Sequence, residues 1–114
     1  MPGVSSDPDL AKPLVRLLAN GTNWRLISAL EEGPSFPRQL AARLQITEGQ
    51  AQKHLRRLAQ AGLVEGHWHH EGKTVKQYVL RVRAVHLRFH DGHIESELDV
   101  HDRPTPEPRG AGKR

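Results

Sequence analysis

The stretch Thr47–Val64, TEGQAQKHLRRLAQAGLV, is the part of the chain that decides the fold. Thr47 can accept a hydrogen bond from the free amides of a helical first turn, and Glu48 suits the positive end of the helix dipole. Gly62 can take the left-handed conformation that ends a helix. Apolar residues recur at four- and three-residue intervals and so share one buried stripe: Ala51, Leu55 and Leu58. The stretch predicts an amphipathic helix over Thr47–Gln60 that runs directly into a strand.

The opposite face of this helix carries amides and cations and almost no carboxylate: Gln50, Gln52, Lys53, Arg56 and Arg57. Amides can hydrogen-bond base edges and cations can hold phosphates, so this face suits a nucleic acid. Five Lys or Arg residues lie between Arg38 and Arg57 against the single acid Glu48, whereas residues 91–102 hold five acids and no Lys or Arg. The basic charge is therefore concentrated in one region.

Length and composition set the class of protein. With 114 residues the chain can hold one domain of modest core, and 17 Lys and Arg against 13 Asp and Glu give a net charge of +4. The absence of cysteine excludes disulfides, zinc–thiolate sites and thiol chemistry. The first residues lack the pattern of a signal peptide, and no apolar run is long enough to cross a membrane. We therefore expect a soluble, cytoplasmic protein with no membrane partner.

Three helices are expected before the central one: Asp7–Ala19, Asn23–Glu32 and about eight residues from Pro37. Pro13 would cost the first of them a hydrogen bond, so that helix either starts nearer Asp9 or bends. The second helix is expected to be capped by Thr22 and to bury Trp24, Leu26, Ile27 and Leu30. The third is expected to turn Leu40, Ala41 and Leu44 inward.

Two β-hairpins are expected after the central helix. The first comprises strands 64–70 and 75–80 around Glu71-Gly72, and the second spans 84–100 around Asp91-Gly92, a pair that favours a type I′ turn. That turn predicts these cross-strand pairs: His90 with His93, Phe89 with Ile94, Arg88 with Glu95, His86 with Glu97 and Val85 with Leu98. The narrow apolar face of the second hairpin must be covered. Either the hairpin extends the sheet of its own subunit, or it docks with the first helix against a second subunit.

The order of elements predicts an α+β fold, a winged helix-turn-helix with four helices and a β-hairpin wing, followed by an additional C-terminal β-hairpin. We expect a flexible N-terminus over residues 1–6, the DNA-binding domain over 7–82, the hairpin extension over 83–102 and a disordered basic tail over 103–114. The chain has no internal repeat of the kind that builds solenoids.

Two segments, LANGTNWRLISAL and QLAARLQITEGQAQKHLRRLAQAGLVEGHWHHEGKTVKQYVL, resemble the ArsR-type family of prokaryotic transcriptional regulators. The resemblance covers about residues 10–80. Its most specific part consists of Thr47 at the cap, His54-Leu55 in mid helix and Ala61-Gly62-Leu63-Val64 at the end. The chain departs from the family where many members have a long last helix that closes a dimer, because the second hairpin stands in that place.

The resemblance implies a sequence-specific regulator of transcription, expected to be a repressor, that binds double-stranded DNA as a homodimer. It would read the major groove with Thr47–Gln60 and hold the backbone with the wing. The residues expected to contact DNA are Arg38, Thr47, Glu48, Gly49, Gln50, Gln52, Lys53, Arg56, Arg57, Lys73 and Lys76. Gln50 and Gln52 suit adenine through paired amide contacts, and the cations suit guanine or phosphate. The alternative is a winged helix that binds proteins without reading DNA, because fold alone does not decide function.

Metal sensing and catalysis are the remaining possibilities. His86, His90 and His93 share one face with Glu95 and Glu97, a donor set that zinc or nickel accepts. Such faces commonly carry histidine as an ordinary polar residue, and the spacing matches no metal motif, so we expect neither a metal site nor a cofactor; the effector stays open. Ser28 and Ser35 have no nearby histidine and acid in a catalytic arrangement, so the chain is not expected to be an enzyme.

Overall fold

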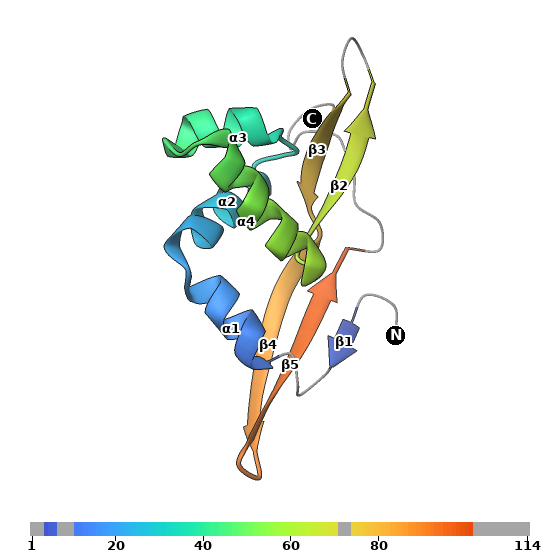
Figure 1. Ribbon diagram of the computed structural model, residues 1–114. Helices are drawn as coiled ribbons and strands as arrows, with labels where there is room; N and C mark the ends of the chain where they lie inside the picture. The colour runs from blue at the N-terminus through green and yellow to red at the C-terminus, as the bar shows by residue number, and fades with distance from the viewer. Residues whose placement is uncertain (1–3, 7–10, 71–73, 102–114) are drawn as a thin grey trace.

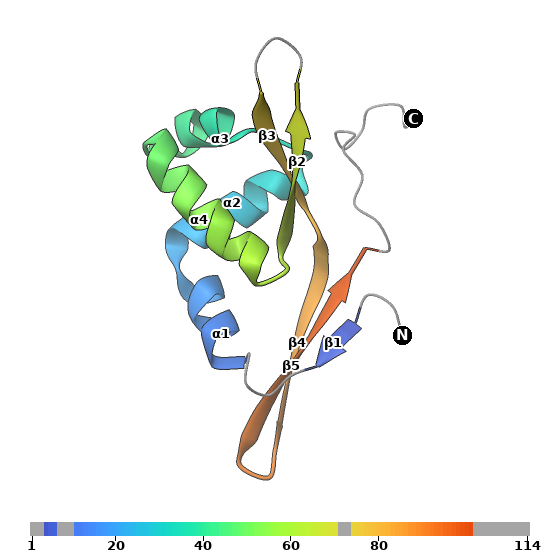
Figure 2. The ribbon, with the colours of Figure 1, turned by 45° about the vertical axis from the view of Figure 1, so that its right-hand side comes forward.

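The computed structural model describes residues 4–6, 11–70 and 74–101. The elements follow in the order β1 (Val4–Ser6), α1 (Ala11–Ala19), α2 (Gly21–Glu31), α3 (Pro37–Leu44), α4 (Glu48–Gln60), β2 (Val64–His69), β3 (Val75–Leu80), β4 (Val82–His90) and β5 (His93–Val100). The helices lie on one side of the strands, with the hairpin β2–β3 at one end of the molecule and β4–β5 at the other (Figure 1, Figure 2). The predicted α+β winged helix-turn-helix with a second hairpin is confirmed. Within the described ranges, every helix is too short or too polar to span a bilayer.

Pro13 lies in the described part of helix α1, Ala11–Ala19. The late start and the bend that the sequence left open both depend on the residue at which the helix begins. The predicted opening of the helix at residues 7–10 lies outside the described residues.

The predicted cap of the second helix was wrong by two residues. Helix α2 begins at Gly21, and the cap is Asn20, whose side-chain oxygen accepts a hydrogen bond from Asn23 N (3.0 Å). Asparagine caps at least as well as threonine, and Asn20 has the extended backbone that a cap needs. Asn20 thus separates α1 from α2, and Thr22 lies inside the helix.

The face that α2 buries also differs from the predicted one. Asn23 is 2% exposed and lies on the inner face with Leu26 and Leu30, which are buried as predicted. Trp24, one helical position further round, is 60% exposed, so its predicted place in the core was wrong. Asn23 can be buried there because its amide nitrogen donates to the carbonyl of Leu17 (3.0 Å), which satisfies the polar group.

Helices α3 and α4 meet at a tight turn. Helix α3 opens at Pro37, as predicted, and ends at Gln45, which has the left-handed conformation (φ 60°). Thr47 then caps α4: its hydroxyl accepts from Gln50 N (3.0 Å), and its own N–H donates to the Gln50 side-chain oxygen (3.0 Å). This reciprocal capping box confirms the predicted start of the helix.

The core lies where the helices meet the first strand of the wing. The predicted inner residues of α4 and of α3 are buried. The largest fully buried side chains are Leu26, Leu40, Leu55, Leu58 and Leu63. Gly62 ends α4 in the left-handed conformation (φ 83°), so that Leu63 enters the core immediately after the helix.

The wing is attached to the helices by backbone hydrogen bonds. Strands β2 and β3 pair antiparallel with Trp68 opposite Lys76 and Gly66 opposite Tyr78. Ser35, in the loop before α3, donates from its N–H to the carbonyl of Tyr78 (3.0 Å) and accepts from the N–H of Tyr78 (2.8 Å). The buried ring of Tyr78 adds to this attachment, so the wing has a defined position beside α3.

The second hairpin has the predicted register. All five predicted pairs, from His90 with His93 to Val85 with Leu98, are present. Asp91 (φ 51°) and Gly92 (φ 73°) both have positive φ, as a type I′ turn requires. The hairpin starts at Val82 rather than 84, with an irregularity between Val82 and Ala84. The domain boundary predicted at 82/83 therefore falls inside β4.

The apolar face of this hairpin is covered only in part by the described residues. Val85 and Leu98 lie against the core, which places the base of the hairpin on its own subunit. Further towards the turn, Leu87, Phe89 and Ile94 expose 40%, 70% and 41% of their surface. Strands β4 and β5 also form a sheet separate from β2–β3, so the hairpin does not extend the wing sheet.

A short strand at the N-terminus was not predicted. Val4–Ser6 form β1, which pairs antiparallel with β5 and places Ser5 opposite Leu98. A flexible N-terminus was expected for residues 1–6, whereas Val4–Ser6 form a strand in the structure. Short polar segments give a weak strand pattern, and the open edge of β5 supplies the hydrogen-bonding partner. The tail predicted over 103–114 lies outside the described residues.

Replacing Leu55 with alanine should lower the free energy of unfolding by about 2–5 kcal/mol, because the side chain has no exposed surface and would leave a cavity. Chemical denaturation measures the change. Gln60→Ala, an exposed position on the same helix, should stay within about 0.5 kcal/mol of the parent. Similar losses in both variants would contradict the position of Leu55 in the core.

Candidate nucleic-acid interface

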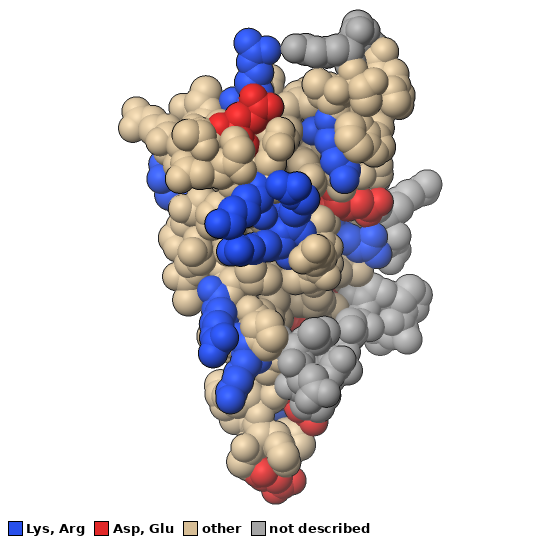
Figure 3. All heavy atoms as spheres, in the orientation of Figure 1, with Lys and Arg blue, Asp and Glu red and all other residues tan. Residues whose placement is uncertain are grey.

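The outer face of α4 is exposed to solvent at every position where DNA contacts were predicted. Burial of Ala51, Leu55 and Leu58 sets the rotation of the helix about its axis. The exposed residues are Thr47, Glu48, Gly49, Gln50, Gln52, Lys53, Arg56 and Arg57, together with Arg38 on α3. Lys76 on the wing is half-buried, and Lys73 lies outside the described residues. Figure 3 shows Lys and Arg side chains gathered over the middle of the molecule, where α4 lies in Figure 1.

The cations of α4 have no carboxylate partner within the described ranges. Lys53, Arg56 and Arg57 form no ion pair there. Arginines on other elements do form ion pairs, with N–O distances of 2.7 Å for Arg43–Glu32, 2.8 Å for Arg81–Glu65, 3.0 Å for Arg83–Asp99 and 2.6 Å for Arg88–Glu97. The charge of α4 is therefore available to a polyanion, whereas much of the charge elsewhere is neutralised locally.

Both glutamines of the predicted reading face already form hydrogen bonds. The side-chain oxygen of Gln50 accepts from Thr47 N in the capping box, and Gln52 Nε2 donates to Glu48 Oε2 (3.3 Å). A paired amide contact to adenine needs both the oxygen and the nitrogen of the side chain. Gln50 would have to loosen the capping box, and Gln52 its bond to Glu48, to make that contact.

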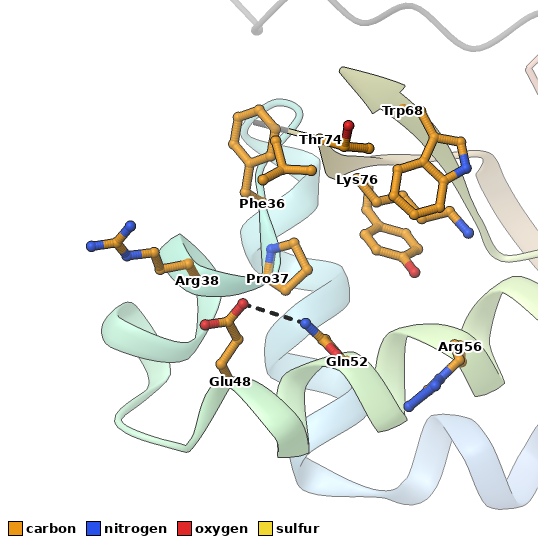
Figure 4. Close-up of a pocket in the computed structure, with 11 residues that line it drawn as sticks. Phe36, Pro37, Arg38, Glu48, Gln52, Arg56, Trp68, Thr74 and Lys76 are labelled. Atoms are coloured by element: carbon orange, nitrogen blue, oxygen red, sulfur yellow. Dashed lines mark hydrogen bonds between the residues drawn. The ribbon is translucent and has the colours of Figure 1, made fainter. Parts of the chain in front are cut away.

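A groove of about 510 Å³ separates α3 and the start of α4 from the wing (Figure 4). Its lining combines rings and cations: Phe36, Trp68 and Tyr78 with Arg38, Arg56 and Lys76. The linked pair Glu48 and Gln52 also lines it, on the side of α4. Burial raises the pKa of the Tyr78 phenol, an effect that the charge of Arg56 opposes, and the phenol stays neutral at physiological pH.

Lys76 lies across the wing inside this groove. Its Nζ is 5.3 Å from the centre of the Trp68 ring and 5.7 Å from that of Tyr78, within the range of cation–π attraction. The stem of Lys76 crosses Gly66, where an added Cβ would lie 2.5 Å from Lys76 Cε. Glycine at 66 thus lets the lysine lie flat against the strand.

The sequence analysis did not assign Phe36, Trp68 or Tyr78 to the interface. Trp68 is 59% exposed, which is unusual for tryptophan in a short strand. The one signal for these residues in the sequence was the hairpin register, which pairs Trp68 with Lys76. The register does not show which face of the wing lies towards α3 and α4.

His54 connects α4 to the first two helices. Its Nδ1 lies 2.8 Å from Asn23 Oδ1, and because the Asn23 amide nitrogen donates to Leu17 O, the histidine must donate from Nδ1. Burial lowers the pKa of His54, and the charges of Arg57 and Lys53 lower it further. His54 is therefore a neutral positioning residue at physiological pH.

The low pKa of His54 predicts a loss of stability in acid. The unfolded chain, with the usual histidine pKa of about 6.5, takes up a proton before the folded chain does. The free energy of unfolding should therefore fall as the pH drops below about 6.5 towards the lowered folded pKa. Denaturation at pH 7.5 and 5.5 should show this fall reduced in His54→Gln and unchanged in the exposed control His86→Gln. An equal fall in parent and His54→Gln would contradict the assignment.

The candidate metal ligands on the second hairpin are not brought together. His90 lies opposite His93, but His86 lies opposite Glu97, further from the turn. His90 Nε2 contacts Glu95 Oε2 at 3.1 Å. Among the described residues, no three His, Asp or Glu side chains are arranged to hold a metal ion.

Two comparisons with known proteins found a match. A family model described as a helix-turn-helix domain matches residues 18–67, from the end of α1 into β2. The NMR structure of the cadmium metal sensor CMTR from Mycobacterium tuberculosis is 40% identical over 59% of this chain and 66% of that one, with a TM-score of 0.49. This chain thus matches about two thirds of the length of that sensor. No curated protein matches the sequence.

The matched segment and the order of helices and wing define a winged helix-turn-helix protein, a class of DNA-binding regulators. The matched helix-turn-helix segment includes the stretch Thr47–Val64, on which the resemblance to the ArsR-type family of transcriptional regulators rests.

Proposed function

We propose that this protein is a sequence-specific repressor that binds double-stranded DNA with α4 in the major groove and the wing on the sugar–phosphate backbone. The observation that carries the proposal is that Lys53, Arg56 and Arg57, on the outer face of α4, form no ion pair with the residues that the structure describes. A helix of this diameter fits the major groove of B-DNA, and cations without a protein partner need not break an ion pair to contact phosphate or guanine.

Two regions of the surface would have different roles in binding DNA. Gln52 and Lys53 would contact base edges, because the N-terminal part of a recognition helix enters the major groove. Arg56, Arg38 and Lys76 line the groove between α4 and the wing, where the phosphate backbone beside the major groove would pass. Base contacts specify the sequence, and phosphate contacts fix the position of the protein on the duplex.

We further propose that two copies act together in the cytoplasm. One winged helix reads too few base pairs for useful specificity, and a two-fold dimer doubles the contact with DNA. The alternative is a winged helix that binds proteins, but a helix face whose cations form no ion pair with the described residues fits nucleic acid better. The chain acts by binding, and we propose no catalytic step.

Cadmium sensing by the relative does not by itself identify an effector for this chain. CMTR is a cadmium sensor, whereas these 114 residues contain no cysteine, the thiolate ligand that cadmium favours. We therefore propose regulation of DNA binding without a thiolate metal site in this chain.

Lys53→Ala tests the reading helix. Selection from random duplexes supplies a cognate fragment, and fluorescence anisotropy then measures affinity across salt concentrations. The variant should lose about 1–3 kcal/mol of binding if Lys53 contacts a base. If Lys53 contacts phosphate, the slope of log affinity against log salt should become shallower by about 1.

The matched control is Arg83→Ala, which removes the same charge from a paired arginine on β4. It should bind the cognate duplex like the parent at equal salt. Parent-like affinity and slope in Lys53→Ala would show that α4 does not read the DNA.

The groove predicts a spectroscopic signal from Trp68. The chain contains two tryptophans, so Trp24→Phe leaves Trp68 as the single emitter. Duplex binding in the groove should change its emission, with the same midpoint as the anisotropy titration, because a backbone beside Lys76 alters the surroundings of the ring. The converse variant, Trp68→Phe, retains Trp24 on α2 outside the groove and should change less. Unchanged Trp68 emission at saturating DNA would remove the wing from the interface.

A further inference from the structure

The groove between α4 and the wing is lined by rings as well as cations, and the proposed contact with phosphate uses only the cations. Phe36 and Trp68 line the groove together with the buried ring of Tyr78. A sugar–phosphate backbone offers negative charge but no aromatic ring, and the bases of a duplex show only their edges in its grooves. Rings beside cations suit a small ligand that combines a planar apolar group with a negative charge.

The charges that line the groove are ordered along α4. Glu48, Gln52 and Arg56 follow one another at four-residue intervals, so they form one row on the side of the helix that faces the groove. The Glu48 carboxylate already accepts a hydrogen bond from Gln52 Nε2 (3.3 Å). Figure 4 shows Arg56, at the other end of the row, on the side of Trp68 and Lys76. An anion that enters the groove is therefore drawn to the Arg56 end and repelled from the Glu48 end.

The phenol of Tyr78 supplies an unused hydrogen-bond donor near these cations. Tyr78 is 4% exposed, and its O–H forms no hydrogen bond with a residue that the structure describes. Burial raises the pKa of this phenol and the charge of Arg56 opposes the rise, so the guanidinium lies close enough to act on the phenol. Lys76 Nζ is 5.7 Å from the centre of the same ring. Two cations and a neutral O–H are a donor set that a carboxylate accepts.

We propose that this groove binds a small aromatic carboxylate and that the ligand competes with DNA. The carboxylate contacts Arg56, Lys76 and the O–H of Tyr78. The aromatic ring lies beside Phe36 and Trp68. The groove volume of about 510 Å³ is within the range of small-molecule sites, roughly 300–1,000 Å³.

Competition follows from the two cations that both partners need. Arg56 and Lys76 line the groove where the phosphate backbone is proposed to pass, so a carboxylate bound to them removes positive charge from the DNA-binding surface. This regulatory part rests on the proposed function, whereas binding of the ligand can be measured in the absence of DNA. The two can therefore fail separately.

Emission from Trp68 in the full-length Trp24→Phe variant tests binding, with benzoate as the probe at constant ionic strength. A saturable change is expected, because the Lys76 ammonium that gains the carboxylate lies 5.3 Å from the centre of the indole ring. Cyclohexanecarboxylate has the charge without the aromatic ring and should bind several-fold more weakly. Benzamide has the ring without the charge and should bind about tenfold more weakly.

Two substitutions in the same variant locate the ligand. Arg56→Ala and Tyr78→Phe each remove one proposed donor and should weaken benzoate binding about tenfold or more, as expected for a hydrogen bond to a charged group. Tyr78→Phe keeps the buried ring and removes an oxygen that bonds no described residue, so thermal unfolding should stay near the parent value. The matched control is Arg16→Ala, which removes the same charge from an exposed position on α1 outside the groove and should bind benzoate like the parent.

Fluorescence anisotropy with the cognate duplex tests the competition. At the benzoate concentration that half-saturates Trp68, the apparent Kd for the duplex should rise about twofold, as mass action requires of a competitor. Cyclohexanecarboxylate at the same concentration and ionic strength should raise it less.

The absence of a saturable change with benzoate, or parent-like binding in Arg56→Ala or Tyr78→Phe, overturns the proposed site. Equal weakening in Arg16→Ala also overturns it, because binding would then follow net charge. Benzoate binding that leaves the affinity for the duplex unchanged overturns the competition. A chain that binds benzoate through Arg56 and Tyr78 but binds no duplex would support the ligand site and contradict the proposed function instead.

Discussion

Burial of one face of α4 is the constraint on which the remaining structure depends. Ala51, Leu55 and Leu58 have no exposed surface, and Leu63, also fully buried, follows after the turn at Gly62. Because successive helical residues are separated by 100°, fixing the buried stripe fixes the outward direction of every other side chain on the helix. The cations of α4 are therefore held outward by the cost of exposing leucine, and the surface proposed to contact DNA is a consequence of core packing.

The charged side chains of α4 also differ from those of the other elements in their ion pairs. Away from α4, several arginines are neutralised by nearby carboxylates, as in Arg43–Glu32 and Arg81–Glu65. His54 lies beside these cations on α4. Its burial and the charges of Arg57 and Lys53 lower its pKa and keep the imidazole neutral, and its Nδ1 forms a hydrogen bond with Asn23 Oδ1. Positive charge thus stays on the solvent side of α4, and the side facing α2 is satisfied by a neutral hydrogen bond.

The two hairpins follow each other directly along the chain but differ in the contacts that hold them in place. Strands β3 and β4 are separated by Arg81 alone, whose N–H donates to Leu63 O (2.9 Å) and whose carbonyl accepts from His101 N (2.9 Å). The wing is anchored by the Ser35 bridge and the buried Tyr78, which leaves Trp68 and Lys76 over the groove. Among the described residues, Val85 and Leu98 pack the base of the second hairpin on the core, whereas Phe89 nearer the turn is exposed.

The sequence by itself determined the elements whose signals are local: the capping box at Thr47, the stop at Gly62, and the turn at Asp91-Gly92 with its cross-strand pairs. It misplaced the cap of α2 by two residues, and it placed Trp24 rather than Asn23 on the inner face, because burial of Asn23 depends on Leu17 and His54 from other helices. The groove, the exposure of Trp68 and the pairing of β1 with β5 were decided by tertiary structure alone. Their partners lie far apart in the chain, and periodicity within one segment carries no information about which surfaces will meet.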